Sequence, residues 1–167
     1  MIERKQLGLA VVGSGRIGTL RSRLAMDHPA VRFIAVSDLV EANAQKLGKT
    51  VGASVASTDN RAIIAHPDVN AVIVSTSEGE HLDAVLAAIE LGKPVLVEKP
   101  IALSTADADR IIAASAKANV EVRVGYSRRF KDRYLVAKEQ IVQGRIGKVI
   151  GAAMRVYNSR SQALAML

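Results

Sequence analysis

The sequence predicts an α/β fold in which a doubly wound parallel sheet is covered by helices on both faces. Apolar runs of strand length alternate with amphipathic helical patterns from residue 7 to residue 142. The segments that join them are short, which favours parallel strands linked by right-handed crossovers. The first apolar run also ends in a glycine cluster within which a helical pattern begins. In such a sheet ligands bind beyond the carboxyl ends of the strands, so we expect the functional residues there.

The glycine cluster follows a strand expected at residues 9–12 and opens a helix with the apolar pattern Ile17, Leu20 and Leu24. The first glycine permits a sharp turn, the second lets a ligand approach bare backbone, and the third lets the helix pack closely on the strand. Free N–H groups and the positive end of the helix dipole then face one point. We therefore expect the diphosphate of a dinucleotide to be bound by Gly13, Ser14, Gly15, Arg16, Ile17 and Gly18.

A second strand is expected at residues 31–36, and Ser37 and Asp38 follow it. Asp38 lies 20 residues after Gly18, the offset at which an acidic residue holds the ribose 2′-hydroxyl of a dinucleotide. Its carboxylate would repel a 2′-phosphate, so we expect NAD to be preferred over NADP, a preference that Ser37 and Arg16 would weaken. A cation such as Arg16 is disfavoured in the first turn of a helix by up to about 1 kcal/mol unless a phosphate is bound there. A solvated surface arginine is the alternative.

The rest of the chain continues the alternation as far as Gly144. The later strands are expected at residues 53–57, 71–76, 95–99 and 121–125. The later helices are expected at residues 40–47, ending at Gly48; at 61–65, capped by Thr58 or Asp59; at 82–89, closed by Gly92; at 108–115, capped by Ser104; and at 130–141. Six parallel strands joined in this way make a Rossmann fold.

Composition limits the classes of protein and partner. Of the 167 residues, 49% are apolar and 23% charged, as in ordinary globular domains, and the absence of cysteine excludes disulfides and thiolate metal sites. His28 and His66 each precede a proline and are not paired, so no metal site is expected.

The net charge of +7 suggests nucleic acid as a partner. However, the basic residues are spread along the chain and only 3% of residues are aromatic, so we expect no binding to nucleic acid. The charged residues 1–6 precede an apolar run of only strand length, so we expect no signal peptide, no membrane contact and a cytoplasmic location.

Lys99 stands at the end of an expected strand, before Pro100, which keeps it extended. Its ammonium group would project into the crevice at the strand ends, while Glu98 points to the opposite face. There Lys99 could donate a hydrogen bond to a substrate oxygen and manage the proton released during hydride transfer. A surface lysine at a strand end is the alternative. The same edge of the sheet also carries Ser75, Thr76 and Tyr126.

Four segments resemble the glucose-fructose oxidoreductase / inositol 2-dehydrogenase (Gfo/Idh/MocA) family of NAD(P)-dependent oxidoreductases. They are GSGRIG, VSD, STSEGEHLDAVLAAIELGKPVLVEKP and VGYSRRFKDRYLVAKEQIVQGRIGKV, and the resemblance covers essentially the whole chain. It implies a nucleotide-binding domain, and Lys99 as a catalytic or substrate-orienting residue beside a Lys99-Pro100 peptide that can be cis. It also implies sugars, cyclitols or related polyols as substrates.

The resemblance extends to further site residues. Thr76 and His81 match a Thr-Pro-Asn-x-x-His segment that lies along the cofactor in the family, although Ser77 and Glu78 replace the proline and asparagine. A helix-capping or surface role is the alternative for His81. The segment 128–130 resembles one beside the substrate, with a charged helix start as the alternative. Besides the glycine cluster, Ser37 and Asp38, we expect cofactor contacts at Ser75, Thr76, His81 and Glu98, and substrate contacts at Lys99, Tyr126 and Arg129.

After Gly144, the apolar face of residues 148–157 predicts the first strand of a second α+β domain. We therefore expect a dinucleotide-binding domain at 1–147 and the start of another domain at 148–167. The resemblance implies a larger second domain, so the chain is expected to be an N-terminal piece that binds NAD with little turnover. An exposed apolar strand favours pairing between copies, so we expect a homo-oligomer, for which this strand offers a dimer contact. The alternative function is a non-catalytic dinucleotide sensor or docking module.

Overall fold

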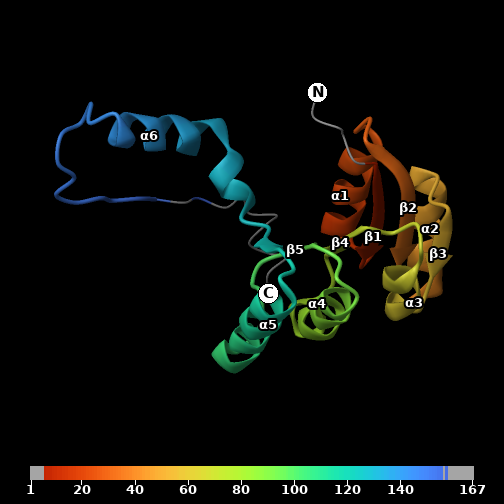
Figure 1. Ribbon diagram of the computed structural model, residues 1–167. Coiled ribbons are helices and arrows are strands. Elements are labelled where there is room, and N and C mark those ends of the chain that lie inside the picture. The colour runs from red at the N-terminus through yellow and green to blue at the C-terminus, as the bar shows by residue number, and fades with distance from the viewer. Residues whose placement is uncertain (1–5, 156, 158–167) are drawn as a thin grey trace. The chain divides into compact units, whose positions relative to one another are not determined.

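The computed structural model describes residues 6–155 and 157 and divides into two compact units, residues 1–126 and 127–167. The first unit contains six strands: β1 (Leu7–Val12), β2 (Val31–Ser37), β3 (Val55–Ser57), β4 (Ala71–Val74), β5 (Val95–Val97) and β6 (Val122–Val124) (Figure 1). They form one parallel sheet in the order β3-β2-β1-β4-β5-β6. The predicted doubly wound Rossmann sheet is confirmed. The strand order reverses at β1 and β4, which places a ligand crevice at their carboxyl ends.

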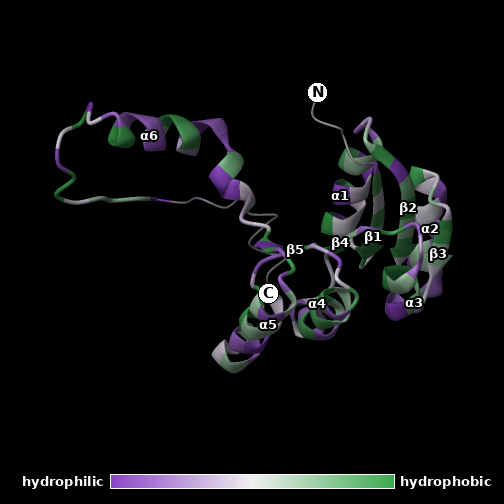
Figure 2. Ribbon diagram, in the orientation of Figure 1, coloured by the Kyte–Doolittle hydropathy of each residue, from purple (hydrophilic) through white to green (hydrophobic). Residues whose placement is uncertain are grey.

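Helices cover both faces of this sheet, as predicted. In the described part of the first unit they are α1 (Arg16–Met26), α2 (Glu41–Val51), α3 (Asn60–Ala65), α4 (His81–Glu90) and α5 (Thr105–Ala118), with a short 3₁₀ helix η1 (Glu78–Glu80). Alternate residues of β1 enter two separate apolar cores, Ala10 and Val12 in one and Val11 in the other. Figure 2 shows the apolar character of β1 and α4 that this double burial requires.

Two predicted caps are confirmed, and the strand limits are revised. Asp59 accepts a hydrogen bond from the backbone N–H of Ala62 at 2.9 Å, and Ser104 accepts one from Asp107 at 3.1 Å. The last four strands are each two residues shorter than predicted: β3 begins later, β4 and β5 end earlier at Val74 and Val97, and β6 is shorter by one residue at each end. Ser75 and Glu98, just beyond these limits, still donate their backbone N–H groups to the carbonyl oxygens of Val12 and Val74, so both stay attached to the edge of the sheet.

The buried face of α1 differs from the predicted one. Leu20 and Leu24 are 52% and 59% exposed, whereas Gly18 and Ser22 are buried. A Cβ atom on Gly18 would lie 1.8 Å from the carbonyl oxygen of Gly13, so the helix approaches the glycine loop more closely than leucine side chains would permit. Helix α1 therefore packs against the sheet through its small residues, and its leucines remain exposed to solvent.

The predicted end of α2 at Gly48 is also wrong. The helix continues through Gly48 to Val51 and ends at Gly52, which has a φ of +60° and so provides the left-handed cap. Gly48 is buried, and a Cβ atom there would lie 3.0 Å from the Cβ of Ala56 on β3. Close helix–strand packing, rather than helix termination, explains this glycine.

Lys93 ties the end of α3 to the turn before β5. Its Nζ donates hydrogen bonds to the carbonyl oxygens of Ile64, at 2.5 Å, and His66, at 3.0 Å, and burial lowers the pKa of its ammonium group below the ordinary 10.5. We expect Lys93→Met to lower the free energy of unfolding by about 1–2 kcal/mol, because the carbonyl oxygens of Ile64 and His66 each lose a charged donor. Urea unfolding would measure the loss, with exposed Lys49→Met on α2 as the control, and equal stability of the two variants would contradict it.

The second unit contains a 3₁₀ helix η2 (Ser127–Phe130) and α6 (Asp132–Val142). The strand predicted at residues 148–157 does not form in residues 148–155, since none of them has a partner strand there and a strand needs one. Residues 156 and 158–167, which complete the predicted second domain, lie outside the described residues. Neither α6 nor any other helix in the described residues has the length and apolar character needed to cross a membrane.

Candidate dinucleotide-binding site

The loop between β1 and α1 has the geometry expected from its glycines. Gly13 has a φ of +96°, and a Cβ atom there would lie 2.6 Å from the carbonyl oxygen of Ser75. The close approach of Gly18 to Gly13 leaves no room for a side chain at that position either. By contrast, nothing lies within 4 Å of the place where Gly15 would carry its Cβ. The backbone is therefore open at Gly15, where a ligand could reach it.

This open point is also the amino end of α1. Gly15 is the N-cap residue, no side chain caps the first turn, and that turn contains no acidic residue. The first-turn N–H groups are consequently available to an anion, and the helix dipole favours one. These properties suit a diphosphate at the position that the sequence predicts.

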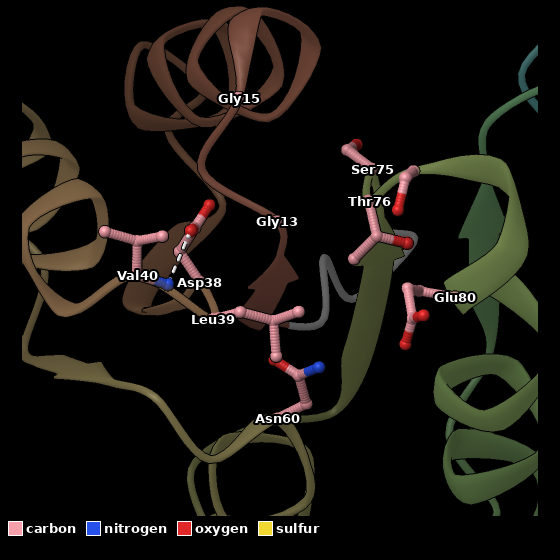
Figure 3. Close-up of a pocket in the computed structure, with 10 residues that line it drawn as sticks. Gly13, Gly15, Asp38, Leu39, Val40, Asn60, Ser75, Thr76 and Glu80 are labelled. Atoms are coloured by element: carbon pink, nitrogen blue, oxygen red, sulfur yellow. Dashed lines mark hydrogen bonds between the residues drawn. The ribbon is translucent and has the colours of Figure 1, made fainter.

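The carboxylate of Asp38 lies beside the glycine loop. Its Oδ2 accepts a hydrogen bond from the backbone N–H of Ser14 at 2.9 Å. Its Oδ1 accepts hydrogen bonds from the N–H of Val40 at 2.9 Å, marked by the dashed line in Figure 3, and from Nδ2 of Asn43 at 3.2 Å. Oδ1 already accepts two bonds, whereas Oδ2 accepts one and can accept another, so Asp38 is held in place with capacity left for a ribose hydroxyl.

Ser37, by contrast, faces the interior. It is fully buried, and its Oγ donates to Oδ1 of Asn60 at 2.7 Å. Its carbonyl oxygen accepts hydrogen bonds from the N–H of Gly13 and from Oγ of Ser14. Ser37 thus joins the ends of β1 and β2 beneath the site. A direct contact between Ser37 and a cofactor remains a prediction.

A cavity of about 280 Å³ lies at the carboxyl ends of β1, β2 and β4. Figure 3 shows Asp38, Leu39, Val40 and Asn60 on one side of it and Ser75, Thr76 and Glu80 on the other. The predicted residues that line it are Gly13, Gly15, Asp38, Ser75 and Thr76. The sequence reasoning missed Leu39, Val40, Asn60, Ser77 and Glu80. The sequence signal for Leu39 and Val40 was two apolar residues directly after Asp38, beyond the end of the strand, whereas nothing local marks Asn60.

Two hydroxyl groups on the β4 side of the cavity lack partners. Oγ of Ser75 and Oγ1 of Thr76 are buried and form no hydrogen bond within the described protein, and Ser75 is only 8% exposed. An unpaired buried hydroxyl is unfavourable, and a polar ligand in the cavity would satisfy both groups. The glycine cradle, Asp38 and these hydroxyls therefore fit a dinucleotide.

Lys99 is exposed just past β5. The residues on either side of it, Glu98 and Pro100, each form a hydrogen bond with another segment of the chain. Oε1 of Glu98 accepts a hydrogen bond from Nε of Arg21 at 2.9 Å within an ion pair. The carbonyl oxygen of Pro100 accepts one from Nδ1 of His81 at 2.8 Å, and the Lys99-Pro100 peptide is cis, as the family resemblance allows. The ammonium group of Lys99 is thus carried on an anchored turn at the sheet edge.

His81 lies in the interior rather than in the cavity wall. It is 1% exposed, and its Nε2 lies 3.4 Å from the carbonyl oxygen of Thr76. Its ring therefore links the segment after β4 to the turn that carries Lys99. Direct cofactor contacts by His81 and Glu98 remain predictions, as do those of Ile17.

The other predicted residues lie at the limits of the first unit or beyond it. Tyr126 is its last residue and is half exposed, with its N–H donating to the carbonyl oxygen of Val124. Arg129 lies on η2 in the second unit. Their roles toward a substrate remain predictions. Among the described residues, no cluster of three or more histidine, aspartate or glutamate side chains could hold a metal ion.

Dinucleotide-binding domains hold the diphosphate at the amino end of their first helix and the adenosine ribose at an acid after the second strand. The first unit has both groups in place, so it is a domain of this class. Over residues 7–126 the chain matches the Gfo/Idh/MocA oxidoreductase family with its NAD-binding Rossmann fold, and it belongs to that family.

Several members of the family are similar to this chain. It is 36% identical to a myo-inositol 2-dehydrogenase of Thermotoga maritima and 32% identical to a scyllo-inositol 2-dehydrogenase (NAD(+)) of Bacillus subtilis. These alignments cover 84% and 87% of this chain but 42% and 43% of the relatives, so the chain spans less than half of their length. The structure of scyllo-inositol dehydrogenase from Lactobacillus casei with bound NAD(H) and scyllo-inositol superposes with a TM-score of 0.81 at 29% identity, covering 86% of this chain and 43% of that one.

Proposed function

We propose that residues 1–147 form the NAD-binding domain of a dehydrogenase that transfers a hydride between nicotinamide and a hydroxyl-bearing cyclitol or sugar. Residues 148–167 would begin a second domain. The observation that carries the proposal is the open backbone at Gly15 beside the anchored carboxylate of Asp38, both lining one cavity. The inositol dehydrogenases among the relatives support the substrate class.

Different residues of the cavity would bind different parts of the cofactor. The first-turn N–H groups of α1 would hold the diphosphate, and Asp38 would accept hydrogen bonds from the adenosine ribose. Leu39 and Val40, whose side chains are exposed, would pack against the adenine ring. Ser75 and Thr76 would gain the hydrogen-bond partners they lack. When bound, NAD supplies the hydride acceptor.

Lys99 would act on the substrate oxygen. Its ammonium group would hydrogen-bond to the hydroxyl oxygen of the carbon that loses hydride and stabilise the negative charge on it, while the hydroxyl proton passes to a general base that the second domain would supply. Arg21 and His81, through Glu98 and Pro100, would keep that group in position. Tyr126 and Arg129 are the proposed further substrate contacts. Calorimetric titration with NAD tests the cofactor binding on which the proposal depends, and an absence of saturable binding would contradict it.

Cofactor preference should depend on Asp38. At about 4 Å, a carboxylate repels each unit of charge on a 2′-phosphate by about 1 kcal/mol in water and about 4 kcal/mol in a partly buried site. We therefore expect NADP to bind at least about fivefold more weakly than NAD, and Asp38→Asn to reduce that ratio. Parallel titrations of the parent chain and the variant with both cofactors would measure it, and equal dissociation constants in the parent chain would show the preference to be wrong.

A further inference from the structure

A mostly buried ion pair connects helix α1 to the segment that carries Lys99. Oε1 of Glu98 accepts hydrogen bonds from Nε of Arg21 at 2.9 Å and from Nη2 of Arg21 at 2.5 Å. The side chains of Arg21 and Glu98 are 25% and 15% exposed. Three other arginine–carboxylate pairs of the first unit each have a side chain that is at least 60% exposed. The Arg21–Glu98 pair is therefore far better shielded from solvent than these three.

Gly125, the residue after β6, leaves room for this ion pair. It is buried, and a Cβ atom there would lie 2.9 Å from Oε1 of Glu98 and 3.1 Å from Nη2 of Arg21. The φ of Gly125 lies outside the positive range that favours glycine, so its backbone conformation does not require this residue type. The space that the ion pair occupies accounts for it. Helix α1 and the ends of β5 and β6 therefore meet at this pair.

Stability alone explains a shielded ion pair poorly. The desolvation of two charges offsets much of their attraction, and apolar residues of similar size are often at least as stable in their place. Such a pair does fix geometry, because a guanidinium group bonded through two nitrogen atoms has one favoured orientation. Glu98 directly precedes Lys99, so holding the Glu98 side chain against α1 fixes the backbone from which Lys99 extends.

We propose that Arg21 is a positioning residue for Lys99, which it holds through Glu98 in the space that Gly125 leaves. This inference rests on the proposed function, in which the ammonium group of Lys99 stabilises negative charge on a substrate oxygen. A shift of a reacting group by about 1 Å can lower a rate about 100-fold, so the ion pair affects turnover far more than stability. The hydrogen bond from His81 to Pro100 does not involve the pair, so the turn persists without it.

The test replaces both charges by methionine, because removal of one alone would leave the other buried and unpaired. Arg21→Met/Glu98→Met should keep its thermal midpoint within about 4 °C of the parent. In the full-length protein it should nevertheless lower kcat for an inositol at least about tenfold. Gly125→Ala keeps both charges but displaces them, so it should lower kcat in the same way. Arg61→Met/Glu90→Met is the matched control, because it removes an exposed ion pair between α3 and α4.

A second measurement does not depend on turnover. NMR relaxation on the 167-residue chain gives the order parameter of the Lys99 backbone amide, which should fall from about 0.85 toward about 0.6 in Arg21→Met/Glu98→Met. The control variant should keep the parent value. A pair that contributed only to stability would leave this order parameter unchanged at an unchanged thermal midpoint.

The outcomes separate this inference from the proposed function. Loss of kcat in Arg21→Met/Glu98→Met and Gly125→Ala, but not in the control, supports the positioning role. If a full-length parent oxidises no cyclitol or sugar, the proposed function fails, and the order parameter alone decides whether Arg21 holds Lys99. Parent-like kcat or, in an inactive parent, an unchanged order parameter would overturn the inference. So would an NAD dissociation constant that rises as much as kcat falls, because Glu98 would then be a cofactor contact.

Discussion

A chain carrying Gly15→Thr is expected to lose NAD binding while remaining folded. The space above Gly15 is empty, so the new side chain meets no protein atom. Threonine is about as favourable as glycine at an N-cap, and the backbone there, with a φ of −68°, accepts it. The side chain would occupy the approach to the first-turn N–H groups of α1, and its hydroxyl would compete for them. Losing two charge-assisted hydrogen bonds predicts a dissociation constant for NAD raised at least about 100-fold.

The neighbouring Gly18 supplies the contrasting variant. A Cβ atom there would overlap the carbonyl oxygen of Gly13, so Gly18→Ala must displace the helix from the loop. We expect it to lower the free energy of unfolding by about 3 kcal/mol. Thermal unfolding and calorimetry on both variants separate the effects: stability should be nearly unchanged for Gly15→Thr and reduced for Gly18→Ala. Parent-like NAD affinity in Gly15→Thr would place the diphosphate elsewhere.

Replacement of Lys99 by methionine is expected to reduce turnover of an inositol by the full-length protein about 10²- to 10⁴-fold. Methionine keeps much of the length of the side chain and removes the group that would bind the substrate oxygen and manage its proton. Because Lys99 does not line the NAD cavity, the dissociation constant of NAD should stay within about twofold. Steady-state kinetics and calorimetry on the same preparation measure both quantities.

Two further variants make the interpretation of Lys99 specific. Lys99→Arg keeps the positive charge but carries it on a larger, planar guanidinium group, so it should restore substrate binding more than turnover. Lys117→Met removes an exposed lysine from the last turn of α5 and should change neither substrate binding nor turnover. If a full-length parent protein that binds NAD oxidises no cyclitol or sugar, the dinucleotide sensor becomes the better interpretation.

Local spacing was enough to predict the core of the candidate site. The interval from Gly18 to Asp38 contains one helix and one strand, so the positions of both residues follow from the geometry of a single β-α-β unit. The structure places the carboxylate of Asp38 against the N–H of Ser14, inside that unit. The same reasoning located Ser75 and Thr76, because parallel strands bring their carboxyl ends to one edge.

The errors lie where a local pattern has two physical explanations. Leucines at helical spacing predict a buried face, but Leu20 and Leu24 are exposed because α1 packs through Gly18 and Ser22. A glycine after an apolar helical residue predicts a helix end, but Gly48 lies inside α2 because Ala56 on β3 needs the space. In both cases the deciding atom belongs to another segment of the chain.

The sequence by itself determined the doubly wound class, the order of its elements and the glycine–aspartate signature, because those depend on periodicity and on short intervals. Only the tertiary structure decided which small residues bring α1 and α2 close to their neighbours, and how His81 and Arg21 hold the turn that carries Lys99. Those arrangements join segments far apart in the chain. The energies of these contacts depend on distances between segments, which are set when the chain folds and cannot be derived from a local sequence pattern.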